Sequence, residues 1–342
     1  MRPRSPLRAS LSKRRSALAK HLPKALEGDS HSVHQARVAS RRLRETLPVV
    51  GADLDGAKDA KKVRRRMRRL TRVLGPVREL EVTLGMIAPP EIASPEAEAT
   101  PGPAPTPAKD PTAPGREHVA AMLRRDLEKA RERLTAEIDA GKVGDWLGQM
   151  EAIEQAIDPD PAPAARRARS VAARAANGAT PAAAGTARPR ARRAAPVKWR
   201  SELADRLDTR AANLWKALDE AGVLFDSERL HQVRIALKRL RYAMELAGEL
   251  RVAPTGRAVR DLKAVQDTLG TLHDHDVLME YTASAAAQPG LTRVTRASLT
   301  ALNTSFDRTR HELHAQFLAA RPSLDRVYLR ALEVATRART AR

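Results

Sequence analysis

Two short segments of this sequence carry the same pattern of basic and titratable side chains, 197 positions apart. Residues 34–44 read HQARVASRRLR, and residues 231–241 read HQVRIALKRLR. Seven of the eleven positions are identical, and an eighth exchanges Arg41 for Lys238. Guanidinium groups offer forked hydrogen-bond donors and an ammonium offers a compact charge, so the pattern favours contacts with the oxygens of an anion.

Helical spacing confines the charged residues of each segment to one face. They are separated by three, four and three positions, which on a helix of 3.6 residues per turn span an arc of roughly 80°. The charged set is His34, Arg37, Arg41 and Arg44 in the first segment and His231, Arg234, Lys238 and Arg241 in the second. The apolar set on the opposite side is Val33, Ala36, Leu43 and Leu47, then Leu230, Val233, Leu240 and Met244. Each helix therefore has one side for a core and a basic side that is free to face a ligand.

A second pair of segments extends the repeat. Residues 74–82 read LGPVRELEV and residues 269–277 read LGTLHDHDV, at an offset of 195. Arg68 and Lys263 occupy matching positions, each seven residues before the shared glycine. The sequence therefore predicts an internal duplication. The first half also has a further basic stripe at helical spacing, formed by Lys61, Arg65, Arg68 and Arg72.

Helices must position these segments, and the pattern of the chain is helical almost throughout. The expected helical ranges besides the two signature helices are 8–27, 57–87 and 115–157, then 198–221, 256–287 and 291–340. Turns at residues 28–30 and 225–227 precede the signature helices. Since no stretch shows convincing strand alternation, the predicted fold class is all-α, with two related bundles of about four helices.

Two segments have the composition of insertions between helices. Residues 89–115 contain nine prolines, and residues 158–197 are rich in Ala and Pro and contain eight arginines. Neither can bury enough apolar surface to order itself, so both are expected to be disordered. The predicted organisation is a first half at 5–157, a linker at 158–197 and a second half at 198–340. The linker's arginines fit either a weak additional contact with a polyanion or a solvated tether.

Charge is the strongest compositional signal. The formal net charge is +21 and the isoelectric point is about 11.1, which favours a polyanionic partner. Arg outnumbers Lys 49 to 13, a ratio that suits phosphate recognition but that a GC-rich genome would also produce. No apolar run is long enough for a membrane span, no secretory signal is evident, and cysteine is absent. We therefore expect a cytoplasmic protein with no membrane contact.

The two signature helices and the two LG-plus-acid segments together resemble the CHAD family, the conserved histidine α-helical domain. The resemblance covers residues 5–88, 115–157 and 198–340. It implies two pseudo-symmetric four-helix bundles whose basic surfaces meet around a channel or groove. It also implies non-catalytic binding of inorganic polyphosphate there, an association with polyphosphate granules, and polyphosphate-metabolising enzymes as partners.

The resemblance assigns a set of basic residues to polyphosphate binding. The set is His34, Arg37, Arg41, Arg42, Arg44, Arg68, His231, Arg234, Lys238, Arg239, Arg241 and Lys263. His273 departs from the family pattern, which more often has Asn or another polar residue at this position. The two histidines that head the signatures could instead be core or capping residues. A histidine that contacts phosphate would have a raised pKa, and binding would then tighten from pH 8 to pH 6.

Other site chemistries find less support. The HDHD run at 273–276 suggests a metal site, but adjacent helical residues point about 100° apart, so its acids are expected to pair with arginines or to fix helix ends. Residues 79–83 have an acidic pattern similar to triphosphate tunnel enzymes, without the final lysine and on a helix. No phosphate loop, nucleotide fingerprint or catalytic triad context is present, so we expect no metal, no cofactor and no enzyme activity.

Two alternatives to polyphosphate binding stay open. A nucleic acid presents similar phosphates, but the nine aromatic residues, Phe, Tyr and Trp together, provide few stacking platforms. A granule scaffold could instead recruit other proteins through the linkers, and this function is compatible with polyphosphate binding.

Overall fold

The computed structural model describes residues 5–52, 54, 57–87, 110–157 and 198–340. Within these ranges the chain is helical and contains no β-strand, so the predicted all-α fold class is confirmed. The first half comprises α1 (Pro6–Leu26), α2 (Ser30–Gly51), α3 (Ala57–Ile87), α4 (Ala113–Glu137), a 3-10 turn (Ala140–Lys142) and α5 (Val143–Ile157). The second half comprises α7 (Lys198–Ala221), α8 (Ser227–Glu249), α9 (Gly256–Ala286) and α10 (Arg293–Thr340).

Matching aspartates begin the two signature helices. The Asp29 carboxylate accepts a hydrogen bond from the backbone N–H of Ser32 at 2.8 Å, and Asp226 accepts one from Arg229 at 3.0 Å. Each carboxylate satisfies a backbone donor that the first helical turn leaves unpaired. The helices therefore begin at the turns that the sequence predicts, and both begin at equivalent positions.

The apolar side of each signature helix is buried, as its spacing predicts. Val33, Leu43 and Leu47 of α2 are fully buried, and Val233 and Leu240 of α8 are as well. α2 packs between α1 and α3, while α8 packs between α7 and α9. Burying the core side in this way turns the charged side of each helix toward the other half of the molecule.

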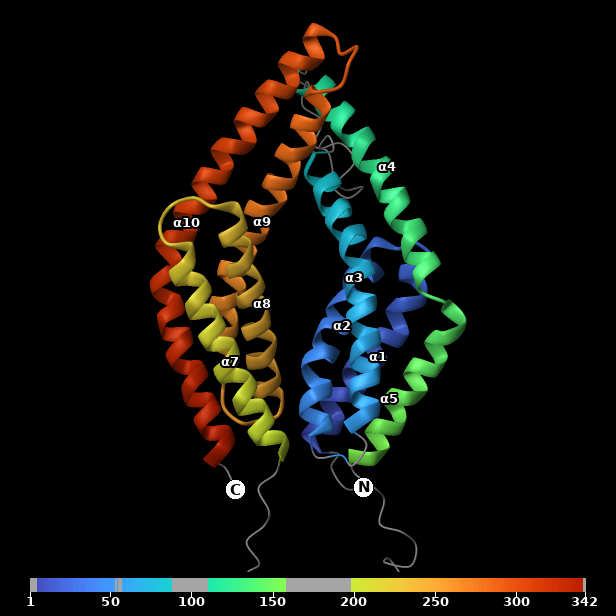
Figure 1. The fold of residues 1–342 in the computed structure, drawn as a ribbon, viewed down its shortest axis with the longest axis vertical. Coiled ribbons are helices and arrows are strands. Elements are labelled where there is room, and N and C mark those ends of the chain that lie inside the picture. Colours follow the sequence, from blue (N-terminus) through green and yellow to red (C-terminus); the bar gives the residue numbers. More distant parts are fainter. Residues whose placement is uncertain (1–4, 53, 55–56, 88–109, 158–197, 341–342) are drawn as a thin grey trace, which may run out of the picture.

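The two halves lie side by side and meet again at one end of the molecule (Figure 1). α4 extends from the first half and packs against α9 and α10 of the second. A small apolar cluster joins these helices to α3, and it includes Ile87, Val119, Leu123, Leu278 and Leu299. Lower in the view, α2 also contacts α7 and α8. The two basic helices are thus held in fixed positions relative to each other.

The two predicted insertions fall largely outside the described residues, which include neither 88–109 nor 158–197. The structure does differ from the sequence-based boundary at residue 115, because α4 already begins at Ala113. Pro114 fits the first helical turn, where its missing N–H is no loss. Gly115 then donates a backbone hydrogen bond to the Ser298 hydroxyl of α10 at 2.8 Å, so the proline signal marks the start of a helix here.

Candidate anion-binding site

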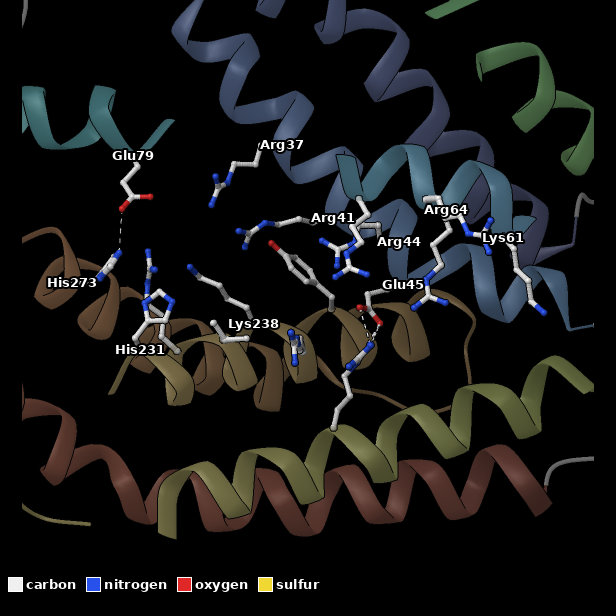
Figure 2. Close-up of a pocket in the computed structure, with 17 residues that line it drawn as sticks. Arg37, Arg41, Arg44, Glu45, Lys61, Arg64, Glu79, His231, Lys238 and His273 are labelled. Carbon is white, nitrogen blue, oxygen red and sulfur yellow. Dashed lines mark hydrogen bonds and ion pairs between the residues drawn. The ribbon is translucent and has the colours of Figure 1, made fainter. Parts of the chain in front are cut away.

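A cavity of about 890 Å³ lies between the two halves, where α2 and α3 face α7, α8 and α9 (Figure 2). Its wall contains eleven Lys and Arg side chains, two carboxylates and two histidines. The basic residues are Arg37, Arg41, Arg44, Lys61, Arg64, Arg65, Arg68, Arg210, Arg234, Lys238 and Arg239. The cavity therefore concentrates positive charge contributed by segments far apart in the sequence.

Arg37 enters the cavity over a glycine of the neighbouring helix. A Cβ atom at Gly75 of α3 would lie 2.9 Å from the Arg37 Nη1 atom, which is closer than such contacts normally come. Nη1 is buried and has no hydrogen-bond partner within the described part of the chain. Burial and then the neighbouring charge of Arg41 lower the pKa of Arg37 to about 10. Gly75 thus leaves room for a guanidinium that holds an unused donor.

The second half repeats this arrangement. Gly270 of α9 lies under Arg234 of α8, and a Cβ there would lie 3.9 Å from the Arg234 Nε atom. Arg234 Nε is also buried without a partner in the described ranges. The repeated LG motif of the sequence therefore places a glycine beside the first arginine of each signature helix. The matched placement of Gly75 beside Arg37 and of Gly270 beside Arg234 supports the internal duplication that we infer from the sequence.

Lys238 lies in the cavity wall together with arginines from both halves. Burial lowers the pKa of its ammonium to about 6, and the charges of Arg234, Arg41 and Arg37 act in the same direction. The carboxylate of Asp274 opposes this shift more weakly. Removing the proton avoids both the desolvation of a charge and repulsion by three guanidiniums. The cavity therefore disfavours the protonated form of Lys238 strongly compared with a lysine on the protein surface.

The two carboxylates of the cavity wall both pair with side chains of the opposite half. Glu79 of α3 lies 3.3 Å from His273 Nε2 of α9, as the dashed line in Figure 2 shows. Glu45 of α2 accepts hydrogen bonds from Arg206 at 2.6 Å and Arg210 at 2.8 Å, both on α7. These contacts join the halves, and the two arginines also offset the negative charge of Glu45 that would repel an anion.

Eight of the twelve residues that the sequence assigns to binding line this cavity, namely Arg37, Arg41, Arg44, Arg68, His231, Arg234, Lys238 and Arg239. The other four do not. Arg42 pairs with Glu245 at 3.1 Å, and Arg241 pairs with the same carboxylate. Lys263 pairs with Asp267 at 2.7 Å on the exposed side of α9. His34 is half-buried outside the cavity wall.

The two signature histidines consequently differ in their surroundings. His231 lines the cavity and lies beside His273, with ring centroids 4.8 Å apart. Burial and then the charge of His273 lower the pKa of His231. Burial and then the charge of Arg78 lower the pKa of His34. Since Arg78 aligns with His273, the two halves place different basic residue types at this position.

The last acid of each LG segment bonds to the first residue of the signature helix. Ser30 donates to Glu81 at 2.9 Å, and Ser227 donates to Asp276 in the second half. Each acid also pairs with an arginine of a later helix: Glu81 with Arg131 at 3.3 Å, and Asp276 with Arg310 at 3.4 Å. Asp276 of the HDHD run therefore pairs with an arginine, as expected. The described ranges contain no group of three potential metal ligands.

Several residues of the cavity wall were not assigned from the sequence. Lys61 and Arg65 belong to a basic stripe that the spacing identified, and Arg64 stands next to them in the same run. Arg210 and Tyr242 belong to no repeated motif, so no signal pointed to them. Arg210 reaches the cavity because it pairs with Glu45 across the two halves.

The fold and the cavity define an all-α protein with a strongly cationic cavity between two helical halves. The chain belongs to the CHAD domain family, since the CHAD domain model matches residues 9–283. No helix within the described residues is both long and apolar enough to cross a membrane. No curated protein matches the sequence significantly.

Two solved structures are similar to this chain. PptA from Streptomyces chartreusis is 19% identical, with 92% of this chain and 97% of that chain covered and a TM-score of 0.47. The CHAD domain from the plant Ricinus communis is also 19% identical, with 96% of this chain and 90% of that chain covered and a TM-score of 0.48.

Proposed function

We propose that this protein binds inorganic polyphosphate, without catalysis, in the cavity between its two halves. The observation that carries the proposal is the charge of the wall, which has eleven Lys and Arg side chains against two carboxylates. Both carboxylates already pair with side chains of the opposite half. Membership of a polyphosphate-related family supports the same ligand.

The arrangement of the cations favours a linear polyanion over a compact one. In Figure 2 the labelled side chains follow the length of the cavity, from His273 and His231 past Lys238 and Arg41 to Lys61. Arginines from facing helices can bind consecutive phosphates through forked hydrogen bonds, and the buried donors of Arg37 and Arg234 are available to them. Each contact is modest, and the affinity comes from many contacts together.

Titration with polyphosphates of graded length tests this function. We expect affinity to rise with chain length and to level off once a chain spans the cavity. Arg41→Gln and Arg234→Gln should each weaken binding roughly tenfold, because each removes a hydrogen bond to a charged group. Arg133→Gln removes an exposed arginine of α4 outside the cavity and serves as the matched control. Equal losses in all three variants would reject the cavity as the binding site.

Competition with DNA separates this function from binding of a nucleic-acid backbone. Tyr242 is the one Phe, Tyr or Trp residue in the cavity wall, and the guanidinium of Arg241 lies 4.6 Å from its ring centroid. Such a wall offers little surface for stacking bases. Long-chain polyphosphate should therefore displace labelled polyphosphate better than DNA at the same phosphate concentration. Equal displacement would favour a general phosphate binder.

We extend the proposal to the place where the protein acts, namely polyphosphate granules of the cytoplasm and the enzymes that metabolise polyphosphate there. A fluorescent fusion of the Arg37→Gln, Arg44→Gln, Arg234→Gln variant should lose granule association in cells that accumulate polyphosphate. Granule association that persists in this variant would assign targeting to the linkers or to a protein partner.

A further inference from the structure

The outer side of α3 carries a row of exposed cations that reaches the cavity. This α3 row consists of Lys58, Lys62, Arg65, Arg69 and Arg72. Its members follow one another at intervals of four, three, four and three residues, which on a helix confines them to an arc of roughly 80° and a length of about 21 Å. Arg65 also belongs to the cavity wall. The α3 row and the cavity are therefore continuous.

Carboxylates neutralise only part of the α3 row. Glu137 of α4 lies 3.4 Å from Arg69 and 3.8 Å from Arg72, so two guanidiniums share one acid. The other three members make no ion pair with any residue that the structure describes. Like charges three and four residues apart repel each other on a helix. A polyanion that lies along the row would relieve this repulsion.

Helix packing does not explain these cations, because the corresponding helix of the second half lacks most of them. α3 packs against α2, and α9 packs against α8 in the same way. At the repeat offset of 195, two of the five matching positions are cationic, the exposed Arg257 and Arg260. Ala264 and Asp267 stand where α3 has the last two arginines of the row. The first half thus has a positive face that the bundle itself does not need.

Exposed cations beside a binding site act mainly on the rate of association. Water and salt screen each charge, so a phosphate gains little from resting on any single one. Several such charges together attract a polyanion over about 10 Å at 0.1 M ionic strength and raise the frequency of productive encounters. Because Arg65 joins the row to the cavity wall, a chain that is held on α3 already lies beside the cavity.

We propose that the α3 row is the capture surface from which inorganic polyphosphate enters the cavity. A chain first contacts the exposed cations of α3 and then passes its phosphates to the arginines of the cavity wall. Lys61 and Arg64, on the same helix, line the cavity at the end opposite His273, and the chain enters there (Figure 2). This inference rests on the proposed function, since it concerns the ligand of the same cavity.

Stopped-flow fluorescence with labelled polyphosphate that is long enough to span the cavity tests the inference. The Lys58→Gln, Lys62→Gln variant removes two charges of the row that lie outside the cavity wall. The matched control, Arg257→Gln, Arg260→Gln, removes two exposed charges of α9 that also lie outside it. At about 50 mM salt the association rate constant should fall roughly threefold in the α3 variant and by less than about 1.5-fold in the control. The dissociation rate constant should stay unchanged in both.

Equal slowing of association in the two variants would overturn the inference, because the net charge of the protein would then explain the effect. Faster dissociation of the α3 variant without slower association would also overturn it. If the α3 variant slowed association of single-stranded DNA but not of polyphosphate, the row would be a nucleic-acid surface instead. Failure of the proposed function has a different signature: Arg41→Gln, within the cavity, would then leave the dissociation rate constant of polyphosphate unchanged.

Discussion

Lys238 shows how a residue can acquire properties that its type does not suggest. It stands where the first signature has Arg41 and therefore reads as a conservative exchange. A guanidinium would stay charged in these surroundings, whereas burial and three neighbouring arginines lower the pKa of the amine to about 6. The exchange therefore replaces a permanent charge with one that is lost at a much lower pH than that of an ordinary lysine.

Replacement of Lys238 by methionine should stabilise the protein. The folded pKa of about 6 lies below the unfolded value, so between these values the unfolded state binds a proton that the folded state does not. The resulting cost is full below pH 6 and is relieved as the pH rises toward about 10. Lys238→Met removes this cost and should raise the free energy of unfolding by about 1–2 kcal/mol near pH 7.

Urea denaturation across the pH range measures this effect. The gain of Lys238→Met over wild type should shrink as the pH rises from 7 to 9.5, whereas Lys263→Met on the exposed side of α9 should change stability by less than about 0.5 kcal/mol at every pH. A gain that is independent of pH would point to packing and not to the buried amine.

Polyphosphate affinity should increase as the pH falls from 8.5 to 7. An occupying polyanion raises the pKa of Lys238 and of His231 above their low values in the empty cavity, so binding takes up protons. The groups that face Lys238 are Arg234 on its own helix, Arg37 and Arg41 on α2, and Asp274 on α9. Each proton taken up changes affinity by at most about tenfold per pH unit.

Titration calorimetry in buffers of different ionisation enthalpy counts these protons. Lys238→Met should lose most of the pH dependence, and His231→Asn should lose the part that remains below pH 7. If Lys238→Met kept the same pH dependence of polyphosphate affinity as wild type, the protons would be taken up by groups other than Lys238. The sequence-based expectation placed this effect on the histidines, whereas we now expect most of it at the lysine, because burial and three guanidiniums lower the pKa of that side chain.

At the scale of elements, each signature helix depends on the helix that follows it. α3 supplies Gly75 under Arg37, and α9 supplies Gly270 under Arg234. The same pairs of helices are joined by the contacts of Ser30 with Glu81 and of Ser227 with Asp276. The LG-plus-acid segment therefore orients the signature helix, which explains why the two motifs occur together in both halves.

The two glycines provide a matched pair of substitutions. Gly75→Ala places a Cβ 2.9 Å from Arg37 Nη1 and should displace this guanidinium, weakening polyphosphate binding severalfold. Gly270→Ala places its Cβ at 3.9 Å from Arg234 Nε, an ordinary contact, and should leave binding unchanged. Alanine is the better helix former by about 1 kcal/mol, although Pro76 after position 75 opposes this gain.

Fluorescence anisotropy with labelled polyphosphate compares the two variants, and thermal melts verify that both are folded. Equal affinity of Gly75→Ala and wild type would show that the position of Arg37 does not matter for binding. A loss in Gly270→Ala as large as that in Gly75→Ala would instead show a general effect on helix packing.

At the scale of the whole molecule, buried ion pairs hold the two halves around the cavity. Glu45 pairs with Arg206 and Arg210, and all three side chains are at most 15% exposed. Burial raises the pKa of Glu45, but the charges and hydrogen bonds of Arg206 and Arg210 together have the larger effect. The pKa of Glu45 is therefore lower than usual. Replacement of this one carboxylate leaves Arg210 without an ion pair at the junction and leaves Arg206 only Glu202, 3.5 Å away on the same helix.

Glu45→Gln should therefore lower the free energy of unfolding by about 3 kcal/mol. Glu137→Gln is the control, since Glu137 pairs with Arg69 at 3.4 Å in a more exposed place and should cost less than about 0.5 kcal/mol. Chemical denaturation at pH 7 measures both variants. Similar small losses would mean that α4 and its packing on α9 and α10 hold the halves together without the buried pairs.

The sequence by itself determined the helices, their buried sides and the pairing of two motifs. These features depend on local rules, since capping residues set where α2 and α8 begin and a period of 3.6 residues separates the apolar side from the charged side. Eight of the twelve assigned basic residues line the cavity for the same reason. Their role in binding polyphosphate stays a prediction.

Only the tertiary structure decided which charges meet in the cavity. Arg42 and Arg241 carry the signature but pair with Glu245, while Arg210 carries no motif and reaches the cavity wall. The angle of a residue on its helix does not reveal the carboxylate or guanidinium that another helix brings opposite. The lowered pKa of Lys238 arises in the same way, because it depends on burial and on guanidiniums from α2 and α8 that act on one amine.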